Sequence, residues 1–580
     1  MKVLNKLYRK SVLATTVIAG TLLSSCTDYL TIIPSNEIVH ENFWQTEDQV
    51  NGMLAHSYIN LISTNAISRA IVWGEVRADN MILPAGGGGE IKDIIEANIN
   101  DENSYCDWSQ FYKAINYANL VLEYAPQVVE RDPDFTEGDL QVVMGEMYAV
   151  RALCHFYLVR AFRDIPMALV PAVNDADIPE YYQVHPLEAL NLIMADLELA
   201  KDMVMKSGGY TTISHNYGRI TENAVLAMMA DVNLWRAAFA QYYEGNSELV
   251  AAGDVQRYYD ECVSNCRELL ANMDRKFEED NKQFNNSDIR YPYNLIQNVT
   301  STDSKKDHFS SAYTEIFGAG NSSESIFELQ IKDNNATASG GCRAIFNMYG
   351  TDTDKGTLIV PANFLSRLYQ DDDLRPYNYT NATSLKAGSS AGTTPTDKNT
   401  DTRIVKYSAK GSPAADYRKS DEFDANWIVY RKTDVLLMMA EALVNSPAAS
   451  DSAFIESFNI VQAINTRSRQ DTTNIKRPLD INQYLTQNAA AQLVLDERAR
   501  ELSYEGKRWF DLVRLALRDG NTNQIKFVAD KLESNSGVVK SKMSTIDGLF
   551  FPIYINELRY NKNLIQNPAY VKEDESIEMN

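Results

Sequence analysis

The chain has 580 residues, of which 44% are hydrophobic and 10% aromatic, and its formal net charge at pH 7 is -23. This apolar content is enough for one large core or two fused cores, which excludes a largely disordered chain. Acidic residues are spread along the sequence, so the protein would repel nucleic acid backbones and anionic lipid headgroups. The 32 tyrosines and many amide side chains favour neutral polar ligands such as sugars.

The N-terminal segment has the order of a secretory signal peptide. Four basic residues in the first ten positions precede an uncharged segment, 11–25, which is too short to span a bilayer comfortably. Leu23-Ser24-Ser25-Cys26 resembles a bacterial lipobox, in which cleavage before the cysteine accompanies acylation of its thiol. We therefore expect residues 1–25 to be removed and Cys26 to carry the lipid anchor.

The remaining cysteines and the histidines indicate neither a disulfide framework nor a zinc site. Five cysteines are an odd number and form no CxxC motif, and the six histidines form no HxxxH pair. We expect these cysteines to be buried as small apolar residues: Cys106, Cys154, Cys262, Cys266 and Cys342. No metal or cofactor is predicted, and a structural calcium ion stays an open alternative.

Apolar residues recur at helical spacing through the first half of the chain. The pattern predicts helices over residues 46–62, 108–125, 139–163, 187–206, 221–241 and 254–273. Pro166 prevents the third helix from continuing. Small residues on the helix faces favour antiparallel pairs like those of tetratricopeptide repeats, although no 34-residue period is visible.

Residues 274–430 have a different character. They are rich in Asn, Asp, Ser, Thr, Gly and Tyr, with a helical pattern in "PANFLSRLY" and a strand pattern in "SIFELQI". Helices are predicted again after this region, including one long helix over residues 490–517. The sequence thus predicts a mainly α frame interrupted by a long irregular insertion, the kind of region that usually carries a binding surface.

Three glutamates at four-residue spacing raise the question of glycoside hydrolysis: Glu497, Glu501 and Glu505. The carboxylates of a glycosidase flank the bond from opposite sides, about 5 to 9.5 Å apart, which one helix face cannot provide. The segment is better explained as a scaffold helix with an apolar stripe that includes Leu502, Gly506 and Trp509. Charges that alternate every three residues, from Glu505 to Arg514, would then form exposed ion pairs beside this stripe.

Other candidate chemical groups have structural explanations. His155 lies in an apolar helix face and is expected to be a hydrogen-bonded core residue rather than a general base. The glycine run "AGGGGE" at 85–90 lacks the Lys-Ser or Lys-Thr of a phosphate-binding loop and is expected to be a flexible loop. Arg375, in "DDDLR", is expected to pair with its acidic neighbours in a turn.

The lipobox is followed along the chain by seven further motifs: "GEMYAVRALCHFYLVRAFRDIPM", "GRITENAVLAMMADVNLW", "SESIFELQ", "VPANFLSRLYQDDDLRP", "YRKTDVLLMMAEAL", "ERARELSYEGKRWFDLVRL" and "FPIYINELRYNKNLIQNPAY". In their identity and order they resemble the motifs of the SusD/RagB family of Bacteroidetes outer-membrane lipoproteins. Three positions depart from the family pattern, because Arg163 and Ala569 stand where glycine is usual and Tyr554 stands where proline is usual.

The resemblance implies a non-enzymatic, lipid-anchored nutrient-binding protein on the outer membrane, facing the cell exterior. Its expected fold consists of tetratricopeptide-like helical pairs in a right-handed superhelical frame. The expected partner is a SusC-like TonB-dependent transporter, to which the protein delivers oligosaccharides. The mature chain would be one domain, 26–580, made of a helical part at 27–273, a ligand-binding insertion at 274–430 and a C-terminal helical part at 431–580.

Sugar-binding sites combine aromatic rings with amide and carboxylate groups. On that basis we nominate ligand-binding residues in the insertion and in the loop after the first helices: Trp73, Asp79, Asn80, Tyr291, Tyr293, Phe346, Tyr349 and Trp427. For each of them the alternative is a packing aromatic or a loop-stabilising polar group. Two other functions stay open, namely a peptide-binding member of the same family and a secreted glycosidase with its carboxylates in the insertion.

Overall fold

The computed structural model describes residues 43–174, 178–282, 292–298, 310–331, 340–351, 354–382, 402–410, 417–418, 422, 424–470, 477–523 and 542–571. Within these ranges the fold is mainly α, as predicted, with two small two-stranded antiparallel sheets. Cys26, the predicted lipid anchor, lies outside the described residues.

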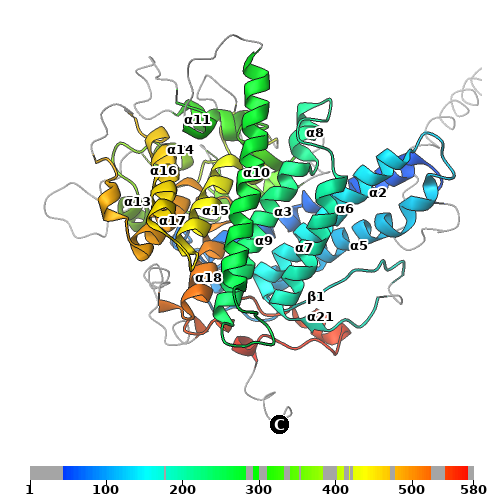
Figure 1. Ribbon diagram of the computed structural model, residues 1–580. Helices are drawn as coiled ribbons and strands as arrows, with labels where there is room; N and C mark the ends of the chain where they lie inside the picture. The colour runs from blue at the N-terminus through cyan, green and yellow to red at the C-terminus, as the bar shows by residue number, and fades with distance from the viewer. Residues whose placement is uncertain are drawn as a thin grey trace, which may run out of the picture.

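The N-terminal helices pack in sequence order, each against the next. They are α2 (Glu47–Leu61), α3 (Thr64–Ile71), α5 (Ser109–Tyr124), α6 (Glu137–Phe162), α7 (Pro186–Met203), α9 (Glu222–Tyr242) and α10 (Asp254–Lys282), with short helices α4 (Glu90–Ile95) and α8 (Ile213–Gly218) between them. Contacts link α2 with α5, α5 with α6, α6 with α7, α7 with α9 and α9 with α10. In Figure 1 helices α2, α5 and α6 form an arm on one side of the long helix α10. The six helices predicted in this half are all present.

The ends of α6 follow from local chemistry. Thr136 and Asp139 form a capping box, in which the backbone N–H of Asp139 donates to Thr136 Oγ1 at 3.2 Å. After Phe162 the backbone of Arg163 has a φ of 70°, a conformation that favours glycine. Of the described helices, α6 has the length and hydropathy to cross a membrane, yet 78% of its most apolar window is buried among its neighbours.

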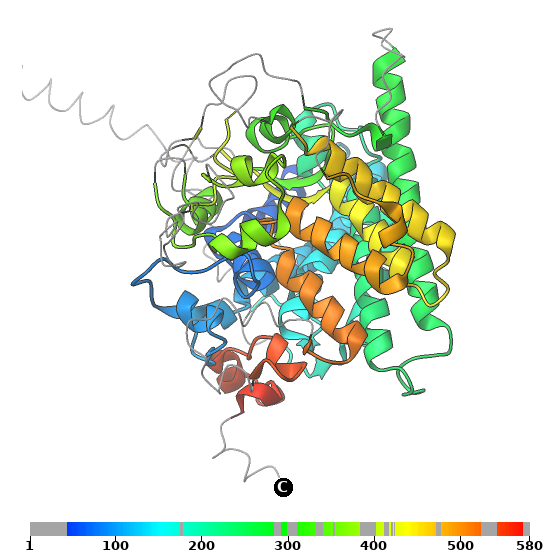
Figure 2. The ribbon, with the colours of Figure 1, turned by 90° about the vertical axis from the view of Figure 1, so that its left-hand side faces the viewer.

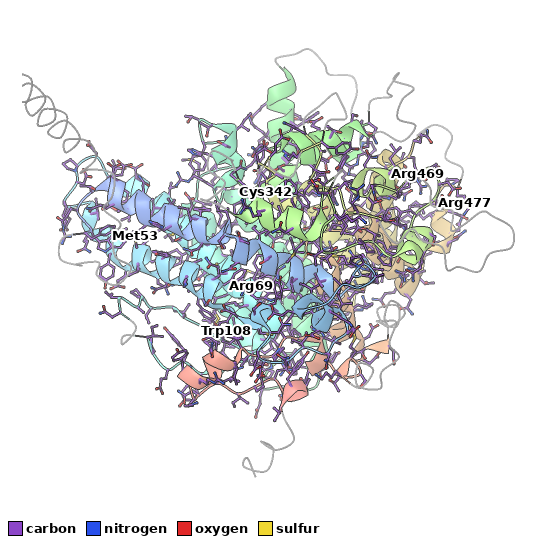
Figure 3. All side chains as sticks on the ribbon, turned by 180° about the vertical axis from the view of Figure 1, so that it is seen from behind. Met53, Arg69, Trp108, Cys342, Arg469 and Arg477 are labelled. Carbon is purple, nitrogen blue, oxygen red and sulfur yellow. The ribbon has the colours of Figure 1, made fainter. Side chains whose placement is uncertain are left out.

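The C-terminal helices continue the stack from α10. Helix α15 (Lys432–Asn445) packs on α10, followed by α16 (Asp451–Arg467) and α17 (Gln487–Glu501), while α18 (Arg508–Asp519) returns to pack on α9. Figure 2 shows α17 and α18, in orange, beside the yellow helices α15 and α16. Seen from behind, Met53 on α2 lies at one end of the molecule and Arg469, just after α16, at the other (Figure 3).

The described residues between α10 and α15 contain more helices and strands than the sequence pattern predicts. Strands β3 (Ser325–Leu329) and β4 (Trp427–Arg431) pair antiparallel, with Leu329 opposite Trp427. Around them lie α11 (Ser311–Tyr313), the π-helix η7 (Thr314–Ala319), α12 (Gly341–Tyr349), α13 (Ala362–Leu368) and α14 (Arg375–Tyr379). The other sheet joins β1 (Ile165–Pro166) to β2 (Gln183–Val184), and α21 (Ile555–Tyr560) lies near the C-terminal end. Helix α13 and strand β3 confirm the two short elements predicted here.

The long helix predicted over 490–517 is wrong, because it is interrupted between Glu501 and Arg508. Tyr504 and Gly506 have φ values of 69° and 71°, which an α-helix does not allow. The turn is pressed against the π-helix η2 (Val72–Val76): a methyl group on Gly74 would lie 2.0 Å from the carbonyl oxygen of Gly506. The apolar spacing predicts that the helix continues through this segment, but the contact with η2 interrupts it.

The core predictions for cysteine and histidine are confirmed. The five cysteines that the structure describes are all buried. His155 is fully buried, and its Nδ1 and Nε2 lie 3.1 Å from the carbonyl oxygen of Arg151 and 3.3 Å from the backbone nitrogen of Ala168. Burial lowers the pKa of His155 to about 3, so it is neutral at physiological pH.

Candidate functional site

The segment around Trp73 is part of the core rather than of a surface loop. The Trp73 ring packs between Phe111 and Phe162, with centroids 5.0 and 5.3 Å away, and its Nε1 donates to the Tyr105 carbonyl oxygen at 2.8 Å. This position buries the ring among other aromatic side chains and gives its one polar atom a hydrogen-bond partner.

Asp79 and Asn80 stabilise the contact between η2 and the turn before α18. Asp79 accepts from Arg508 Nε at 2.9 Å and from Arg367. Burial opposes ionisation of Asp79, but the two guanidiniums hold its pKa below the usual range. Asn80 donates to the carboxylate of Glu75. Both residues are buried and bonded within the protein.

Glu75 organises this contact. Its carboxylate accepts the backbone N–H groups of Tyr504 at 2.6 Å, Lys507 at 2.8 Å and Arg508 at 3.2 Å, which are donors at the start of α18. A carboxylate suits the positive end of a helix dipole. The side chain is nevertheless fully buried, and burial raises the pKa of Glu75 to about 7 despite these hydrogen bonds.

The aromatic residues of the insertion form an internal stack. The rings of Trp427 and Tyr407 are nearly parallel with centroids 5.3 Å apart, and Phe317 meets Tyr407 edge-on at 5.6 Å. Tyr349 lies 6.2 Å from Tyr407 and 6.3 Å from Tyr504, so the stack reaches the turn between α17 and α18. These rings attach the insertion to the helical frame.

Six nominated side chains are therefore buried, none more than 6% exposed: Trp73, Asp79, Asn80, Phe346, Tyr349 and Trp427. Their burial favours the alternative stated for each of them, a packing aromatic or a structural polar group, over direct contact with a ligand. Tyr293 is half-buried, with a φ of 59°, in a short 3-10 turn. Tyr291 lies outside the described residues.

The three glutamates at four-residue spacing lie in a buried ion-pair network. Glu501 contacts Arg467 at 2.6 Å, Arg431 at 2.8 Å and Arg375 at 3.1 Å. Burial opposes its ionisation, but these three guanidiniums hold the pKa of Glu501 far below the usual range. Glu501 is thus a permanent anion enclosed by cations.

The neighbouring glutamates complete this network. Glu497 pairs with Arg375 at 2.6 Å, and Glu505 pairs with Lys406 at 2.6 Å and Arg431 at 2.7 Å. Arg375 also bonds Asp373, two positions away, which confirms the pairing predicted for it. Of the charge ladder predicted for this segment, the pair of Asp511 and Arg514 is present at 2.7 Å, although both residues are buried. Glu505 does not pair along the helix but is buried against Lys406 and Arg431, from the insertion and from β4. The scaffold interpretation itself agrees with these contacts.

A cluster of amide side chains at the edge of β3 and β4 was missed by the sequence analysis. Gln330 Nε2 donates to Asn321 Oδ1 at 2.7 Å, and Asn426 Nδ2 donates to Gln330 Oε1 at 3.2 Å and to Glu328 Oε2 at 2.8 Å. The three amides are half-buried, as Tyr293 is, whereas the six other described nominees are buried. The asparagine-rich composition was the available signal, but strand pairing brings these residues together across about a hundred positions. We refer to Asn321, Gln330 and Asn426 as the amide cluster.

The described residues contain no group of three or more His, Cys, Asp or Glu side chains arranged to hold a metal ion. This observation covers only the ranges that the structure describes.

Two family models match the sequence of this protein. A family model described as "SusD family" matches residues 189–570, and another described as "Starch-binding associating with outer membrane" matches residues 29–234. SusD-like protein P38 of Formosa agariphila is 26% identical over 567 residues, covering 95% of this chain and 96% of the relative. SusD-like protein P2 of the same organism is 24% identical, covering 85% and 88% respectively.

Solved structures agree with this assignment at the level of the fold. A SusD homolog from Bacteroides thetaiotaomicron has a TM-score of 0.65 at 17% identity, covering 92% of this chain and 99% of that one. B. fragilis NanU has a TM-score of 0.63 at 18% identity, covering 93% and 100%. Since the first family model alone matches more than half of the sequence, the chain belongs to the SusD family.

Proposed function

We propose that the protein is a cell-surface lipoprotein that captures oligosaccharide and delivers it to a SusC-like TonB-dependent transporter, without catalysis. The observation that carries this proposal is the pair of family models, one of which is described as starch-binding and associated with the outer membrane. The sequence before residue 27 supports the lipid anchor at Cys26.

The amide cluster is our candidate for ligand contact. Amide groups both donate and accept hydrogen bonds, as sugar hydroxyls do, and a neutral ligand avoids repulsion by a chain with a net charge of -23. The cluster is half-buried and lies beside Gly320, where the side chain of Asn426 would be 3.1 Å from an added Cβ. Half-buried Tyr293 stays a candidate stacking ring, and we expect modest affinity because the ligand must be released again.

The first test is calorimetry of the mature protein against plant, microbial and host oligosaccharides. We expect one class to bind, and Asn321→Ala and Asn426→Ala to weaken binding by about tenfold. Gln141→Ala is the matched control, because it removes an exposed amide on α6 that bonds the Asp202 carbonyl oxygen. Binding of extended oligopeptides without glycan binding would favour the peptide-binding alternative. New reducing ends that persist in highly purified protein would overturn the non-catalytic role.

Anchoring and partnership need separate measurements. We expect Cys26→Ala to abolish incorporation of labelled fatty acid and to release the protein from membrane fractions. We also expect a TonB-dependent transporter to co-purify with the acylated protein from outer membranes. Membrane retention of the Cys26→Ala protein without acyl label would contradict the proposed anchor.

A further inference from the structure

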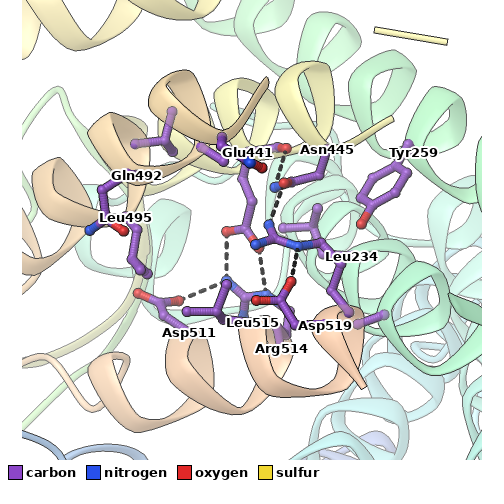
Figure 4. A pocket seen from close by; sticks show the side chains of 15 residues that line it. Leu234, Tyr259, Glu441, Asn445, Gln492, Leu495, Asp511, Arg514, Leu515 and Asp519 are labelled. Atoms are coloured by element: carbon purple, nitrogen blue, oxygen red, sulfur yellow. Dashed lines mark hydrogen bonds and ion pairs between the residues drawn. The ribbon is translucent and has the colours of Figure 1, made fainter. Parts of the chain in front are cut away.

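The charged cleft between the C-terminal helices is lined by side chains that pair with one another. It has a volume of about 390 Å³ and lies between α9, α10, α15, α17 and α18. Figure 4 shows Glu441 and Asp511 directed toward Arg514, which donates to the two oxygens of Glu441 at 2.9 and 2.7 Å and to Asp511 Oδ1 at 2.7 Å. These contacts hold the helices together, and a different surface of the molecule points to a partner.

Exposed large apolar side chains are concentrated on two segments, the loop between β1 and β2 and the C-terminal segment that begins with α21. Six of the thirteen such side chains among the described residues lie here, and each of the other seven is on a different helix or loop. Single exposed apolar residues are normal on a protein surface, whereas a concentration of them marks an interaction site. We call these six residues the apolar patch: Leu169, Val170, Ile178, Tyr182, Tyr560 and Ile565.

Hydrogen bonds hold the two segments side by side. Asn561 Nδ2, next to Tyr560, donates to the carbonyl oxygen of Tyr181 at 2.7 Å. The backbone N–H of Ile565 donates to Gln183 Oε1 at 2.7 Å. In Figure 1 α21 and β1 lie next to each other at the lower edge of the molecule. Because the bonded residues belong to the apolar patch or adjoin it, the patch is one surface that spans both segments.

The loop between β1 and β2 is also fixed to helix α5. Asn116 donates from Nδ2 to the carbonyl oxygen of Ala172 at 2.9 Å, and its Oδ1 accepts from the backbone N–H of Ala172 at 2.8 Å. Asn119 Nδ2 donates to the carbonyl oxygens of Ala168 and Val170 at 3.0 and 3.1 Å. A surface that is held in place before binding loses less conformational entropy when a partner covers it.

Helix α5 also receives the chain that comes from the proposed lipid anchor. The Trp44 ring stacks on Tyr124, the last residue of α5, with centroids 5.6 Å apart. Tyr124 is five residues beyond Asn119, about 7.5 Å along the helix axis. Residues 27–42, which connect Cys26 to the described chain, can span at most about 60 Å. The anchor therefore keeps this end of the arm, with the loop bound to it, near the outer membrane.

The composition of the apolar patch fits a protein partner better than a lipid surface. The net charge of -23 repels anionic lipid headgroups. Helix α21 has six residues, much shorter than the amphipathic helices that bind membrane interfaces. Tyrosine together with aliphatic side chains is typical of the buried centre of a protein–protein interface.

The apolar patch lies away from the amide cluster. Gln330 of the cluster lies against Gly218, at the end of α8. Helix α8 is at the upper side of the molecule in Figure 1, whereas α21 is at the lower edge. A partner that covers the patch therefore leaves the amide cluster accessible to a ligand.

We propose that the apolar patch is a docking surface for an apolar surface of the outer-membrane transporter. This inference rests on the transporter partnership put forward under the proposed function. It assigns docking and ligand contact to different residues on opposite sides of the molecule.

Co-purification of the transporter with the acylated, full-length protein from detergent-solubilised outer membranes measures this docking. Tyr560→Asp/Ile565→Asp introduces two charges into the apolar patch and should lower the recovery of the transporter at least about tenfold. The matched control is Ile455→Asp/Leu485→Asp, which introduces the same charges at two exposed apolar positions on α16 and before α17. This control should recover as much transporter as the unmodified protein.

The outcomes separate the patch from the partnership. Equal recovery with the unmodified protein and the patch variant overturns the docking surface and leaves the proposed function standing. If the unmodified protein recovers no transporter, the partnership fails and the docking surface fails with it. If only the binding of protein-free vesicles of outer-membrane lipid falls in the patch variant, the patch meets lipid and the proposal is overturned.

A photo-crosslink tests the same contact if the patch variant fails to fold. Benzoylphenylalanine in place of Tyr560 keeps an aromatic ring at a side chain that is 85% exposed. We expect it to form a covalent adduct with the transporter in outer membranes, and the same probe in place of Leu485 to form none. Absence of the Tyr560 adduct, or equal adducts from both positions, would overturn the proposal.

Discussion

Helices α17 and α18 carry clusters of charge on two sides. Toward the insertion and β4, every oxygen of Glu501 contacts a guanidinium, and Glu505 is enclosed by Arg431 and Lys406. Toward α15, Asp511 is just as buried, yet one of its oxygens has no donor among the described residues. The first cluster, which we call the junction, takes its cations from the insertion, β4 and α16, whereas the second consists of residues on α15, α17 and α18. Each side nevertheless leaves one buried acid oxygen without a hydrogen bond among the described residues, Oε2 of Glu324 next to Arg467 and Oδ2 of Asp511, so the two sides differ in how many cations surround each acid.

The junction should be the more sensitive of the two to loss of a charge. Glu501→Ala leaves Arg375, Arg431 and Arg467 with an uncompensated buried charge, which typically costs about 3–5 kcal/mol. The free energy of unfolding in urea measures this loss. Glu456→Ala is the control, because its pair with Arg267 is largely exposed and contributes under about 1 kcal/mol. Equal losses in the two variants would mean that the network contributes no more than a surface pair.

Titration of Glu75 tests the neighbouring contact between η2 and the turn before α18, and it does so without removing an ion pair. Its pKa is about 7 in the folded protein, against 4.5 for an unperturbed group. The folded state therefore binds more protons between these values, so the contribution of Glu75 is complete below pH 4.5 and is lost as the pH rises through 7. The difference corresponds to roughly 3 kcal/mol.

The measurement is the free energy of unfolding at several pH values between 4.5 and 7.5. Glu75→Gln has no proton to lose and should flatten this part of the curve, whereas Glu456→Ala should keep the slope of the unmodified protein. Coincident slopes for Glu75→Gln and the unmodified protein would show that another group governs this range.

Substitutions at two glycines with similar backbone angles test how closely the turn between α17 and α18 is packed against α3 and η2. Gly506 and Gly520 have φ values of 71° and 64°, so alanine is strained at both by about 1 kcal/mol. An added Cβ on Gly506 would also lie 2.9 Å from the Ala70 carbonyl oxygen, while Gly520 has open space around it. We expect Gly506→Ala to cost about 1–2 kcal/mol more than Gly520→Ala in thermal unfolding. A difference near zero would mean that the turn moves freely away from α3.

The smallest effect is expected in the N-terminal arm. Thr136→Ala removes the side chain that accepts from the backbone N–H of Asp139 at the start of α6, which typically costs about 1 kcal/mol. Thr136→Ser keeps the hydroxyl and should recover most of this loss in the same urea unfolding measurement. A cost as large as that of Glu501→Ala would contradict the view that the junction dominates stability.

Sequence patterns located the helices, the buried cysteines and the neutral core histidine, because helical periodicity and residue type depend on short segments of chain. They also carried the family resemblance. The site was a different matter, because Trp73 and Trp427 were nominated for ligand contact but are buried, and the amide cluster was not anticipated. Their positions depend on which segments cover one another, and a local pattern contains no such information.

The sequence by itself determined a mainly α chain with helices at definite positions and a chemically distinct middle region. Only the tertiary structure decided that Glu75 breaks the later helix by accepting N–H groups more than 400 positions away. It also decided which charges are enclosed and which oxygen of Asp511 is left open. The physical reason is that burial and hydrogen-bond partners arise from contacts distant in sequence, whereas periodicity reports only the face on which a residue lies.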